Sequence, residues 1–444
     1  MAVHLMKREL KDGLILRSLS EGVESDRTNL PTFYESVFAA EGDTAAWRLN
    51  LWAYDLIHKN HPTVTWDDIW VVVDPAKQDE IVSALLLIPQ TWHYEGVSFG
   101  VGRVELVATH KDYRRRGLVR ALMDAAHERS KALRHLVQAI TGIPHYYRRF
   151  GYAMSVELGA RSMIGLSSIP QIESPTVTLR SAVKTDIPLL VSLSDMYGKT
   201  QQLGTVWDET MFRFEITQRN REAVNTPKFY MIINAESEPV GYIAARIWEN
   251  WASLDAYVVG EKTSYLETFY DVLNGMKQII ETTELDSQRR PKTIYLESGL
   301  HHMIHTMIRK TAPSSVFPHV YAWYIRVSDV GEFLMHIAPV LEKRLKNSAA
   351  HGYTGSLTID FFDLTGVILT FEKGRVIQAV QRVLTEDDRR DAGFPFYSFF
   401  DLIFGRRTTL ELSYILPEVF ASFKAQVLLD TLFPKGYAWL MGLT

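Results

Sequence analysis

Two stretches of this sequence repeat one order of elements, and this repeat constrains the possible folds more than any other feature. In each stretch a Leu-Arg-Ser segment precedes an aspartate: Leu16–Ser18 stands before Asp26, and Leu179–Ser181 stands before Asp186. Apolar runs of strand length follow in both stretches, and each series ends in an amphipathic helix. Strands that alternate with a helix favour a mixed sheet with helices packed on it, so the sequence predicts two tandem domains of one α/β architecture.

The first copy contains four apolar runs of strand length and one helical pattern. Strands are expected at Leu14–Leu19, Ile69–Val73, Ile81–Ile88 and Gly102–Thr109. A helix is expected at Leu118–Arg134, where apolar residues recur at helical spacing. The segment Gly165–Pro175 contains two prolines and three serines, which is typical of a linker. The first domain is therefore predicted at residues 1–175.

The second copy has its strands and its helix in the same order. Strands are expected at Lys228–Asn234, Val240–Trp248 and Ala252–Val259. The helix that follows is expected to bury one apolar face, formed by Leu266, Phe269, Val272, Leu273, Met276 and Ile280. Because this order matches that of the first copy, a second domain of the same fold is predicted at residues 176–326.

The third block, at residues 327–444, has a different pattern. A helical stretch at Val330–Lys346 comes first and is expected to bend at Pro339. Strands are then expected at Ser356–Phe362, Val367–Phe371, Val376–Val380 and Thr408–Leu412, with a closing helix at Val419–Leu432. This block is predicted to be an α+β unit, and the fold class of the whole chain is predicted to be α/β (α+β) with mixed sheets.

Composition excludes several classes of function. The 444 residues include 48 basic and 52 acidic side chains, and the formal net charge of −4 provides no general attraction for nucleic acid or an anionic membrane. The chain has no cysteine, which excludes disulfides, thiolate metal sites and a cysteine nucleophile. No apolar run reaches membrane-spanning length and no signal-peptide pattern stands at the start, so we expect a cytoplasmic protein.

The segment Val104–Arg120 carries the clearest chemical signal. A strand ends there, three consecutive arginines (Arg114–Arg116) follow, and Gly117 leads directly into a helix. The free N–H groups and the dipole at a helix N-terminus favour a phosphate, arginines add charge-assisted hydrogen bonds, and glycine permits close approach to the backbone. Arginines before a helix are also common in a solvated surface turn, so the pattern alone leaves both interpretations open.

These residues resemble a known coenzyme-binding loop. Arg114-Arg-Arg-Gly-Leu-Val119 is similar to the Q/R-x-x-G-x-G/A loop of the Gcn5-related N-acetyltransferases (GNAT), and departs from it at the last position, where Val119 replaces Gly or Ala. The resemblance implies that the chain uses acetyl-CoA as co-substrate. The residues implied in its binding are Val107 and Thr109 on the preceding strand, followed by Arg114, Arg115, Arg116, Gly117, Leu118 and Val119.

A second motif resembles one branch of that superfamily. Tyr147-Arg-Arg-Phe-Gly-Tyr152 is similar to the Y-x-R-F-G-Y segment of the enhanced intracellular survival (Eis) branch, whose members join two GNAT domains to a C-terminal sterol-carrier-protein-like domain. The segment Phe404–Thr408 also resembles that branch. The resemblance implies a GNAT domain at 1–175, a degenerate GNAT domain at 176–326 and a sterol-carrier-protein-like domain at 327–444. It further implies a homo-oligomer, since many members assemble as hexamers.

The resemblance also implies two catalytic groups. Tyr147 would be the general acid that protonates the departing thiolate of coenzyme A, and the C-terminal carboxylate of Thr444 would be the general base that deprotonates the amine. The residue types leave alternatives open, because Tyr147 could simply pack in an aromatic cluster and the apolar tail Tyr437–Thr444 could pack on its own domain. Other candidates for the base are Asp26, Glu105 and His110.

We therefore predict an N-acetyltransferase that moves an acetyl group directly to a primary amine in a ternary complex. The acceptor would be an aminoglycoside, a polyamine or a lysine-like amine, with no nucleic acid or membrane as partner. Two alternatives remain open: a non-catalytic scaffold or sensor that binds acyl-CoA, and a carrier of apolar ligands through the third domain.

Two further patterns indicate that neither a second coenzyme site nor a metal site is expected. The second copy reads Val259-Gly-Glu-Lys-Thr-Ser-Tyr265 where a phosphate loop should lie, and Glu261 would repel a pyrophosphate, so this copy is not expected to bind the coenzyme. His301 and His305 have the spacing of a helical metal site, but the H-E-x-x-H glutamate is missing and no third ligand stands nearby. No metal is expected.

Overall fold

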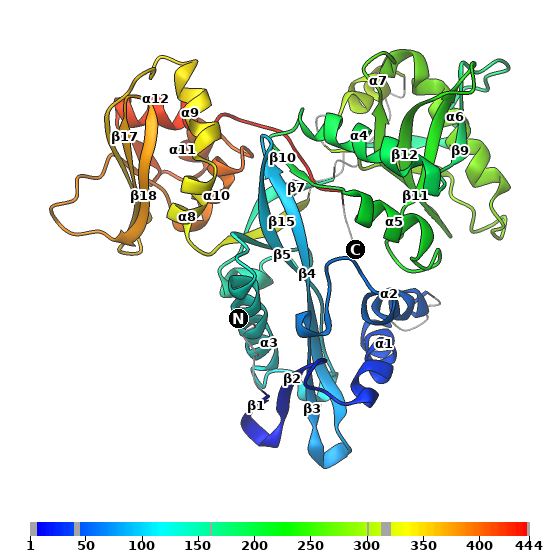
Figure 1. Ribbon diagram of the computed structural model, residues 1–444, viewed down its shortest axis with the longest axis horizontal. Helices are drawn as coiled ribbons and strands as arrows, with labels where there is room; N and C mark the ends of the chain where they lie inside the picture. Colours follow the sequence, from blue (N-terminus) through cyan, green and yellow to red (C-terminus); the bar gives the residue numbers. More distant parts are fainter. Residues whose placement is uncertain (1–6, 40–44, 160–161, 300–301, 312–320, 442–444) are drawn as a thin grey trace.

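The computed structural model describes residues 7–39, 45–159, 162–299, 302–311 and 321–441. It contains three β-sheets that form three lobes, with the first sheet below, the second at the upper right and the third at the upper left (Figure 1). Antiparallel and parallel pairs occur in the same sheets, and helices pack on them, which confirms the predicted α/β (α+β) class. Every helix in the described ranges is too short or too polar to cross a lipid bilayer.

The first sheet has helices on both faces. Its strands, in spatial order, are β1 (Arg8–Glu9), β2 (Ile15–Ser18), β3 (Ile69–Asp74), β4 (Glu80–Tyr94), β5 (Val97–Thr109), β6 (Val137–Ile140), β15 (Tyr321–Val327) and β7 (Ala153–Leu158). On one face α3 (Leu118–Ala132) packs on Trp70 and Val72, and on the other α1 (Glu24–Phe38) and α2 (Trp47–His58) pack on Val71. Because alternate side chains of β3 are buried on opposite faces, the strand reads as a continuous apolar run.

The second sheet repeats this arrangement. Its strands, in spatial order, are β8 (Ser162–Gly165), β14 (Thr293–Leu296), β13 (Trp251–Val259), β12 (Pro239–Trp248), β11 (Lys228–Asn234) and β9 (Val177–Ser181). The helices are α4 (Ile187–Gly198), α5 (Glu209–Thr217), α6 (Tyr265–Thr282) and α7 (Met303–Thr311). The predicted apolar face of α6 is buried except at Leu266, which is 73% exposed at the start of the helix, so its assignment to that face was wrong.

The two sheets exchange strands. β15 follows the second copy in sequence but lies between β6 and β7 of the first sheet, where it pairs antiparallel with both. β8 follows the first copy but pairs with β14 at the edge of the second sheet. The chain therefore returns to the first lobe at β15 after it has formed the second sheet, and the division at residues 175 and 326 stays a prediction.

The third sheet is smaller and has five strands among the described residues: β18 (Arg375–Val383), β17 (Thr365–Glu372), β16 (Gly355–Asp360), β19 (Ala392–Gly393) and β20 (Phe420–Ala421). Its helices are α8 (Val330–His336), α9 (Ala338–Lys346), α10 (Phe396–Ile403), α11 (Thr409–Ile415) and α12 (Phe423–Leu432). The predicted bend is confirmed, since α8 ends just before Pro339, which lies in the first turn of α9.

The strand predicted at Thr408–Leu412 was wrong, because this segment forms α11 instead. The hydroxyl of Thr408 accepts a hydrogen bond from Glu411 N, and the carboxylate of Glu411 accepts one from Thr408 N. This capping box is a helix-start signal that outweighs the apolar content of the segment. The closing helix begins at Phe423 and not at Val419, since Ser422 caps it.

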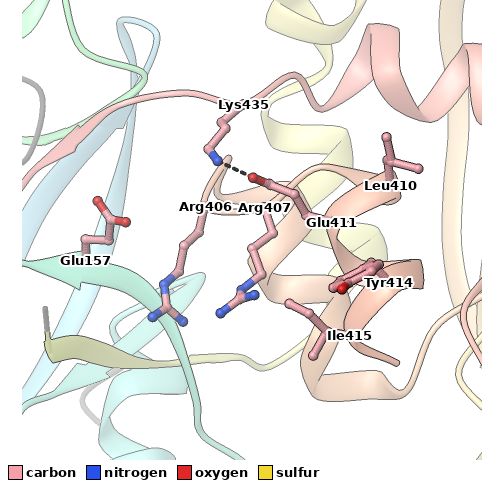
Figure 2. A pocket seen from close by; sticks show the side chains of 8 residues that line it. All are labelled: Glu157, Arg406, Arg407, Leu410, Glu411, Tyr414, Ile415 and Lys435. Atoms are coloured by element: carbon pink, nitrogen blue, oxygen red, sulfur yellow. Dashed lines mark hydrogen bonds and ion pairs between the residues drawn. The ribbon is translucent and has the colours of Figure 1, made fainter. Parts of the chain in front are cut away.

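The third lobe is joined to the first sheet by a shared core and by charged contacts. Trp92, Phe99 and Trp323 of the first sheet belong to one apolar cluster with Phe333 of α8 and Phe400 of α10. Figure 2 shows the neighbouring charged joint, where the side chains of Arg406 and Arg407 run side by side next to Glu157 of β7, around a pocket of about 680 Å³.

The charged joint also fixes the position of β7. Arg406 donates a hydrogen bond to the carbonyl oxygen of Met154 at 2.5 Å, and both arginines pair with Asp401 of α10. Lys435 pairs with Glu411 at 2.5 Å above the arginines (Figure 2). β7 follows the turn that carries Tyr147, so these contacts support the region of the candidate site.

The C-terminal segment returns to the first two lobes. β21 (Ala438–Trp439) pairs in parallel with β10 (Leu203–Thr205), which in turn pairs antiparallel with β4. Trp439 and Met441 are buried in the core of the second lobe. The tail is therefore docked between lobes as far as Met441.

Candidate active site

A β-bulge distorts β5 where the predicted coenzyme contacts begin. Ala84 of β4 lies opposite Ala108, whereas Leu86 lies opposite Glu105, so β5 has one extra residue in this interval. Leu106 takes up the difference with a φ of 51°, in the left-handed region that non-glycine residues seldom adopt. The bulge turns the rest of the strand away from regular pairing.

β5 and β6 separate beyond this point. Their parallel pairing ends at Arg103–Ala139, although β5 continues to Thr109. The edge of β5 from Val104 to Thr109 is therefore not paired with β6, and its backbone groups face an opening between the strands. Val107 and Thr109, both predicted to contact the coenzyme, lie on this open edge and line a cavity of about 640 Å³.

The loop after β5 gives α3 an open N-terminus. Gly117 is the N-cap residue with a φ of 80°, and no side chain caps the helix. The first N–H groups of a helix have no acceptor within it, so those of Leu118 and Val119 remain available to a ligand. A Cβ atom built at Gly117 meets nothing within 4 Å, which shows that this position faces open space. The sequence prediction of a helix N-terminus behind a glycine is confirmed.

Four arginines line the same cavity, Arg114, Arg115, Arg120 and Arg149, and none of the described lining residues is acidic. Arg114 donates through Nε to the carbonyl oxygen of Thr109 at 3.4 Å, and Arg120 lies over the ring of Phe150 at 5.0 Å. The combination of free helix amides and guanidinium groups fits the two phosphates of a pyrophosphate.

Arg116, which was predicted with its neighbours, lies differently. Its guanidinium lies 4.9 Å from the ring centre of Tyr113 and pairs with Asp12 at 3.7 Å, and it is not among the cavity-lining residues. The left-handed φ of 65° at Arg115 sends successive side chains of the loop in different directions. The sequence could not show this, because three adjacent arginines look equivalent until the backbone of the loop is known.

Tyr147 lines the same cavity. It belongs to the short 3₁₀ turn Tyr146–Phe150 and is buried among the rings of Tyr146, Phe150 and Tyr324. A Cβ at Gly142 would lie 3.1 Å from its ring, so a glycine with a φ of 138° makes room for it. Among the described residues no group forms a hydrogen bond with its hydroxyl, which leaves that hydroxyl open to a ligand.

The surroundings of Tyr147 keep it protonated. Burial, followed by the negative charge of Glu105, raises the pKa of Tyr147 well above its usual value. The phenol is therefore neutral at physiological pH and can act as a hydrogen-bond and proton donor. Glu105 itself pairs with Arg103 at 2.6 Å.

Strand β15 holds the loop before Tyr147. The hydroxyl of Tyr321 donates to the carbonyl oxygen of Gly142, and that of Tyr324 donates to the carbonyl oxygen of Ile143 at 3.4 Å. The strand contributed from beyond the second copy thus fixes the position of the candidate general acid.

The candidates for the general base lie in different places. Asp26 is buried in a two-bond pair with Arg17, so it supports α1 and does not face the cavity. His110 is half-exposed and accepts a hydrogen bond from Asp112 N. Glu105 is close enough to Tyr147 to shift its pKa. Thr444 lies outside the described residues.

Several cavity residues were missed by the sequence analysis. They are Arg120, Tyr146 and Arg149, which line the cavity together with Val37 and Phe38 at the end of α1. Arg120 and Arg149 had a usable signal, because one stands in the first turn after Gly117 and the other within the Tyr147–Tyr152 motif.

The geometry is matched by comparison with known proteins. Residues 24–155 match a family model described as an acetyltransferase (GNAT) domain. Residues 24–155 form a GNAT domain. This range contains the bulge in β5, the loop with its glycine, and Tyr147, so all the described residues that line the cavity belong to the GNAT domain. A comparison with curated protein sequences finds no match.

Solved structures resemble the whole chain and not only the GNAT domain. A GCN5-related N-acetyltransferase from Anabaena variabilis ATCC 29413 aligns with a TM-score of 0.66 and 13% identity, over 97% of this chain and 100% of that one. A GCN5-related N-acetyltransferase from Kribbella flavida gives a TM-score of 0.62 and 17% identity, again over 97% and 100%. Eis1 from Mycobacterium abscessus gives 0.59 and 12%, with the same coverage. At these identities the likeness establishes a shared fold.

The second copy closes the helix end that the GNAT domain leaves open. The hydroxyl of Ser264 accepts hydrogen bonds from the N–H groups of Leu266 and Glu267 at the start of α6. The amides that would hold a phosphate are therefore already used, and Glu261 and Glu267 add negative charge there. No group of three or more potential metal ligands occurs in the described ranges; His301 lies outside them.

Proposed function

We propose that this protein is an acetyl-CoA-dependent N-acetyltransferase that transfers the acetyl group directly to a primary amine. One observation carries the proposal: the uncapped N-terminus of α3, the four cavity arginines and the open hydroxyl of Tyr147 face one cavity inside the GNAT domain. The aminoglycoside-, polyamine- or lysine-like nature of the acceptor is part of the proposal.

The chain's residues fit the coenzyme along the cavity. The N–H groups of Leu118 and Val119, with Arg114 and Arg115, would hold the pyrophosphate beside Gly117. The open edge of β5 at Val107 and Thr109 would pair with the amide groups of the pantetheine arm, as a strand edge pairs with an extended peptide. Val119 lies in the first turn of α3, is partly buried and lines the cavity.

Bound acetyl-CoA supplies an acetyl thioester, whose carbonyl carbon accepts the amine while the carbon–sulfur bond breaks. Tyr147 then provides a proton for the sulfur, whose thiol pKa is about 8.5 by analogy with cysteine. A neutral phenol suits this role, because it stabilises the developing thiolate by a hydrogen bond before the proton moves. N–H groups on the open edge of β5 would stabilise the charge on the carbonyl oxygen.

The base in this proposal is the C-terminal carboxylate of Thr444, which would take a proton from the acceptor ammonium. The direction of the tail supports the role. Because β21 is parallel to β10 and β10 is antiparallel to β4, Ala438–Trp439 points in the direction that leads along β4 from Tyr94 toward the bulge. Three residues follow Met441, and an extended segment of that length spans about 10 Å.

The proposal is tested by titrating acetyl-CoA into the protein and into a Gly117→Glu variant in a calorimeter. Glutamate at this position adds negative charge and a side chain where the phosphates would lie. Gly96→Glu is the matched control, since Gly96 also has a positive φ (87°) and open space beside it but lies in the β4–β5 turn. We expect one site per chain in the wild type and the control, and loss of binding in Gly117→Glu.

An amine screen that follows released thiol with a dye then tests transfer. Its background is low because the chain has no cysteine. Two coenzyme sites per chain would contradict the assignment of the second copy, and equal binding by Gly117→Glu would contradict the site itself. Binding without turnover of any amine would favour a non-catalytic coenzyme sensor.

A further inference from the structure

The second copy retains a cavity where the GNAT domain has its coenzyme cavity. β13 and α6 correspond to β5 and α3, since β13 also pairs antiparallel with the preceding strand and parallel with the following one. A pocket of about 750 Å³, here named the second pocket, lies between the end of β13, the start of α6 and α4. It is as large as the coenzyme cavity, so duplication kept the space although the phosphate loop is absent.

The charge of the second pocket is opposite to that of the coenzyme cavity. Its charged lining residues are Asp195, Lys199 and Glu261, where the coenzyme cavity has four arginines. Lys199 pairs with Asp195 at 2.7 Å, and the charges of this pair cancel. The carboxylate of Glu261 therefore makes the charge of the lining negative. In the described part of the chain, Glu261 makes no ion pair. A ligand with positive charge is therefore favoured over an anion.

Aromatic rings form much of the wall. Tyr197, Tyr265 and His302 line the pocket, with ring centres 5.8 Å apart for Tyr197–His302 and 5.2 Å apart for Tyr265–His302. Tyr437 of the tail lines it as well. Aromatic faces around a cavity attract organic ammonium ions through their quadrupoles.

Among the described residues of the wall, Lys199 is the only basic side chain besides His302. His302 donates through Nε2 to the carbonyl oxygen of Tyr257 at 2.8 Å, and its Nδ1 accepts from Ile304 N at 3.1 Å. Burial lowers the pKa of His302 to about 4, so the ring is neutral and does not repel a cation. Burial also raises the pKa of Tyr265 to about 12, so its ring is a neutral phenol.

We propose that the second pocket binds an organic ammonium ion, held by the rings of Tyr197 and Tyr265 and by the carboxylate of Glu261. Duplication would then have converted an anion site into a cation site. The second pocket shares no lining residue with the coenzyme cavity, so binding there needs no acetyl-CoA. If the proposed function is correct, an occupant next to Tyr437 also contacts the tail that carries the proposed base.

The test uses choline on the full-length protein without acetyl-CoA. Saturation-transfer NMR follows its trimethylammonium protons, and 3,3-dimethylbutan-1-ol, which has the same shape without the charge, is the matched ligand. We expect saturable binding of choline and at least tenfold weaker binding of the neutral alcohol. The variants Glu261→Gln and Tyr197→Leu should each weaken choline binding about five- to tenfold, the effect of one charge or one ring face near a protein surface.

Glu236→Gln is the control variant, since Glu236 lies in the β11–β12 turn and should leave binding unchanged. Glu261 is exposed on a loop, so its variant should fold even if Tyr197→Leu does not. Equal binding of choline and the alcohol would overturn the proposal, as would choline binding that Glu261→Gln does not weaken. Neither outcome depends on acetyl transfer, so the proposed function can fail or succeed separately.

Discussion

Tyr147 shows how a single residue is prepared for chemistry by its neighbours. Its ring is fixed by three other aromatic rings, while its hydroxyl is left without a partner in the described part of the chain. Replacing it with phenylalanine keeps the packing and removes the proton. We expect Tyr147→Phe to lower kcat about 10²- to 10⁴-fold, the usual contribution of a general acid. Thiol release under saturating acetyl-CoA measures this.

The control for that variant is Tyr146→Phe, the same change at the adjacent residue of the same cavity. Tyr146→Phe should keep kcat within about threefold, and both variants should bind acetyl-CoA as the wild type does. If the two variants lost the same activity, Tyr147 would be a packing residue and the general acid would have to be sought elsewhere.

Buried neutral histidines make stability depend on pH. Burial, followed by nearby arginines, lowers the pKa of His127 to about 3 and of His135 to about 4, against 6.5 for the unshifted group. The unfolded chain therefore binds more protons below pH 6.5, and stability falls as the pH falls through that value. Each histidine should remove about 2 kcal/mol between pH 6.5 and pH 5.

Urea unfolding at pH 7, 6 and 5 measures this slope. His135→Asn should reduce the dependence of the free energy of unfolding on pH by the contribution of one histidine, whatever its effect on stability at pH 7. His351→Asn, at an exposed position, should leave the slope unchanged. A slope unaffected by His135→Asn would mean that other groups control the acid sensitivity.

The sequence predicted about half of the residues that line the cavity. The motif around Gly117 located the helix N-terminus, and the Tyr147 motif located the candidate acid. It could not predict that Arg116 turns away from the cavity or that Glu105 raises the pKa of Tyr147. These are consequences of backbone conformation and of contacts between distant segments, which adjacency in sequence does not encode.

At the scale of elements, strands and helices were predicted where apolar periodicity is strong, and missed where a local cap or a distant partner decides. β3, β11 and α6 lie close to their predicted ranges. The apolar residues of Thr408–Leu412 suggested a strand, but the capping box of Thr408 and Glu411 starts the helix α11 there. The position of β15 between β6 and β7 could not be predicted, because the residues of Tyr321–Val327 do not specify which strands they pair with.

The strand β15 is predicted to position Tyr147 through the loop that precedes it. Its two tyrosine hydroxyls bind the carbonyl oxygens of Gly142 and Ile143, just before the turn that positions Tyr147. The double variant Tyr321→Phe/Tyr324→Phe keeps the rings and removes both hydrogen bonds. We expect kcat to fall about tenfold through misplacement of Tyr147, with the dissociation constant for acetyl-CoA unchanged.

Tyr353→Phe is the control for this variant, since it also removes a hydrogen bond from a hydroxyl to a carbonyl oxygen, but in the third lobe. It should leave kcat unchanged. A double variant with normal kcat would show that β15 stabilises the sheet without positioning the acid.

At the scale of the whole molecule, three lobes share their cores. One face of the first sheet has Trp92, Phe99 and Trp323 in a single cluster with Phe333 and Phe400 of the third lobe. The tail passes back from the third lobe and buries Trp439 in the second. Three structural units that look separable in Figure 1 are therefore connected through apolar contacts and through exchanged strands.

Because the core is shared, we predict that the first two lobes do not fold stably without the third lobe. A chain ending at Ser328 keeps every cavity residue but uncovers the face that packs on α8 and α10. Each large apolar side chain exposed costs about 1.5–3 kcal/mol, and several together exceed the net stability of about 5–15 kcal/mol typical of a domain. We expect this chain to be insoluble, or to bind a hydrophobic dye and lose acetyl-CoA binding.

Co-expression with residues 329–444 as a separate chain should restore solubility and binding by covering that face again. A soluble truncated chain with a cooperative unfolding transition and wild-type acetyl-CoA affinity would instead show that the first sheet is stable without the third lobe, and that the contacts in the shared core serve another purpose than folding.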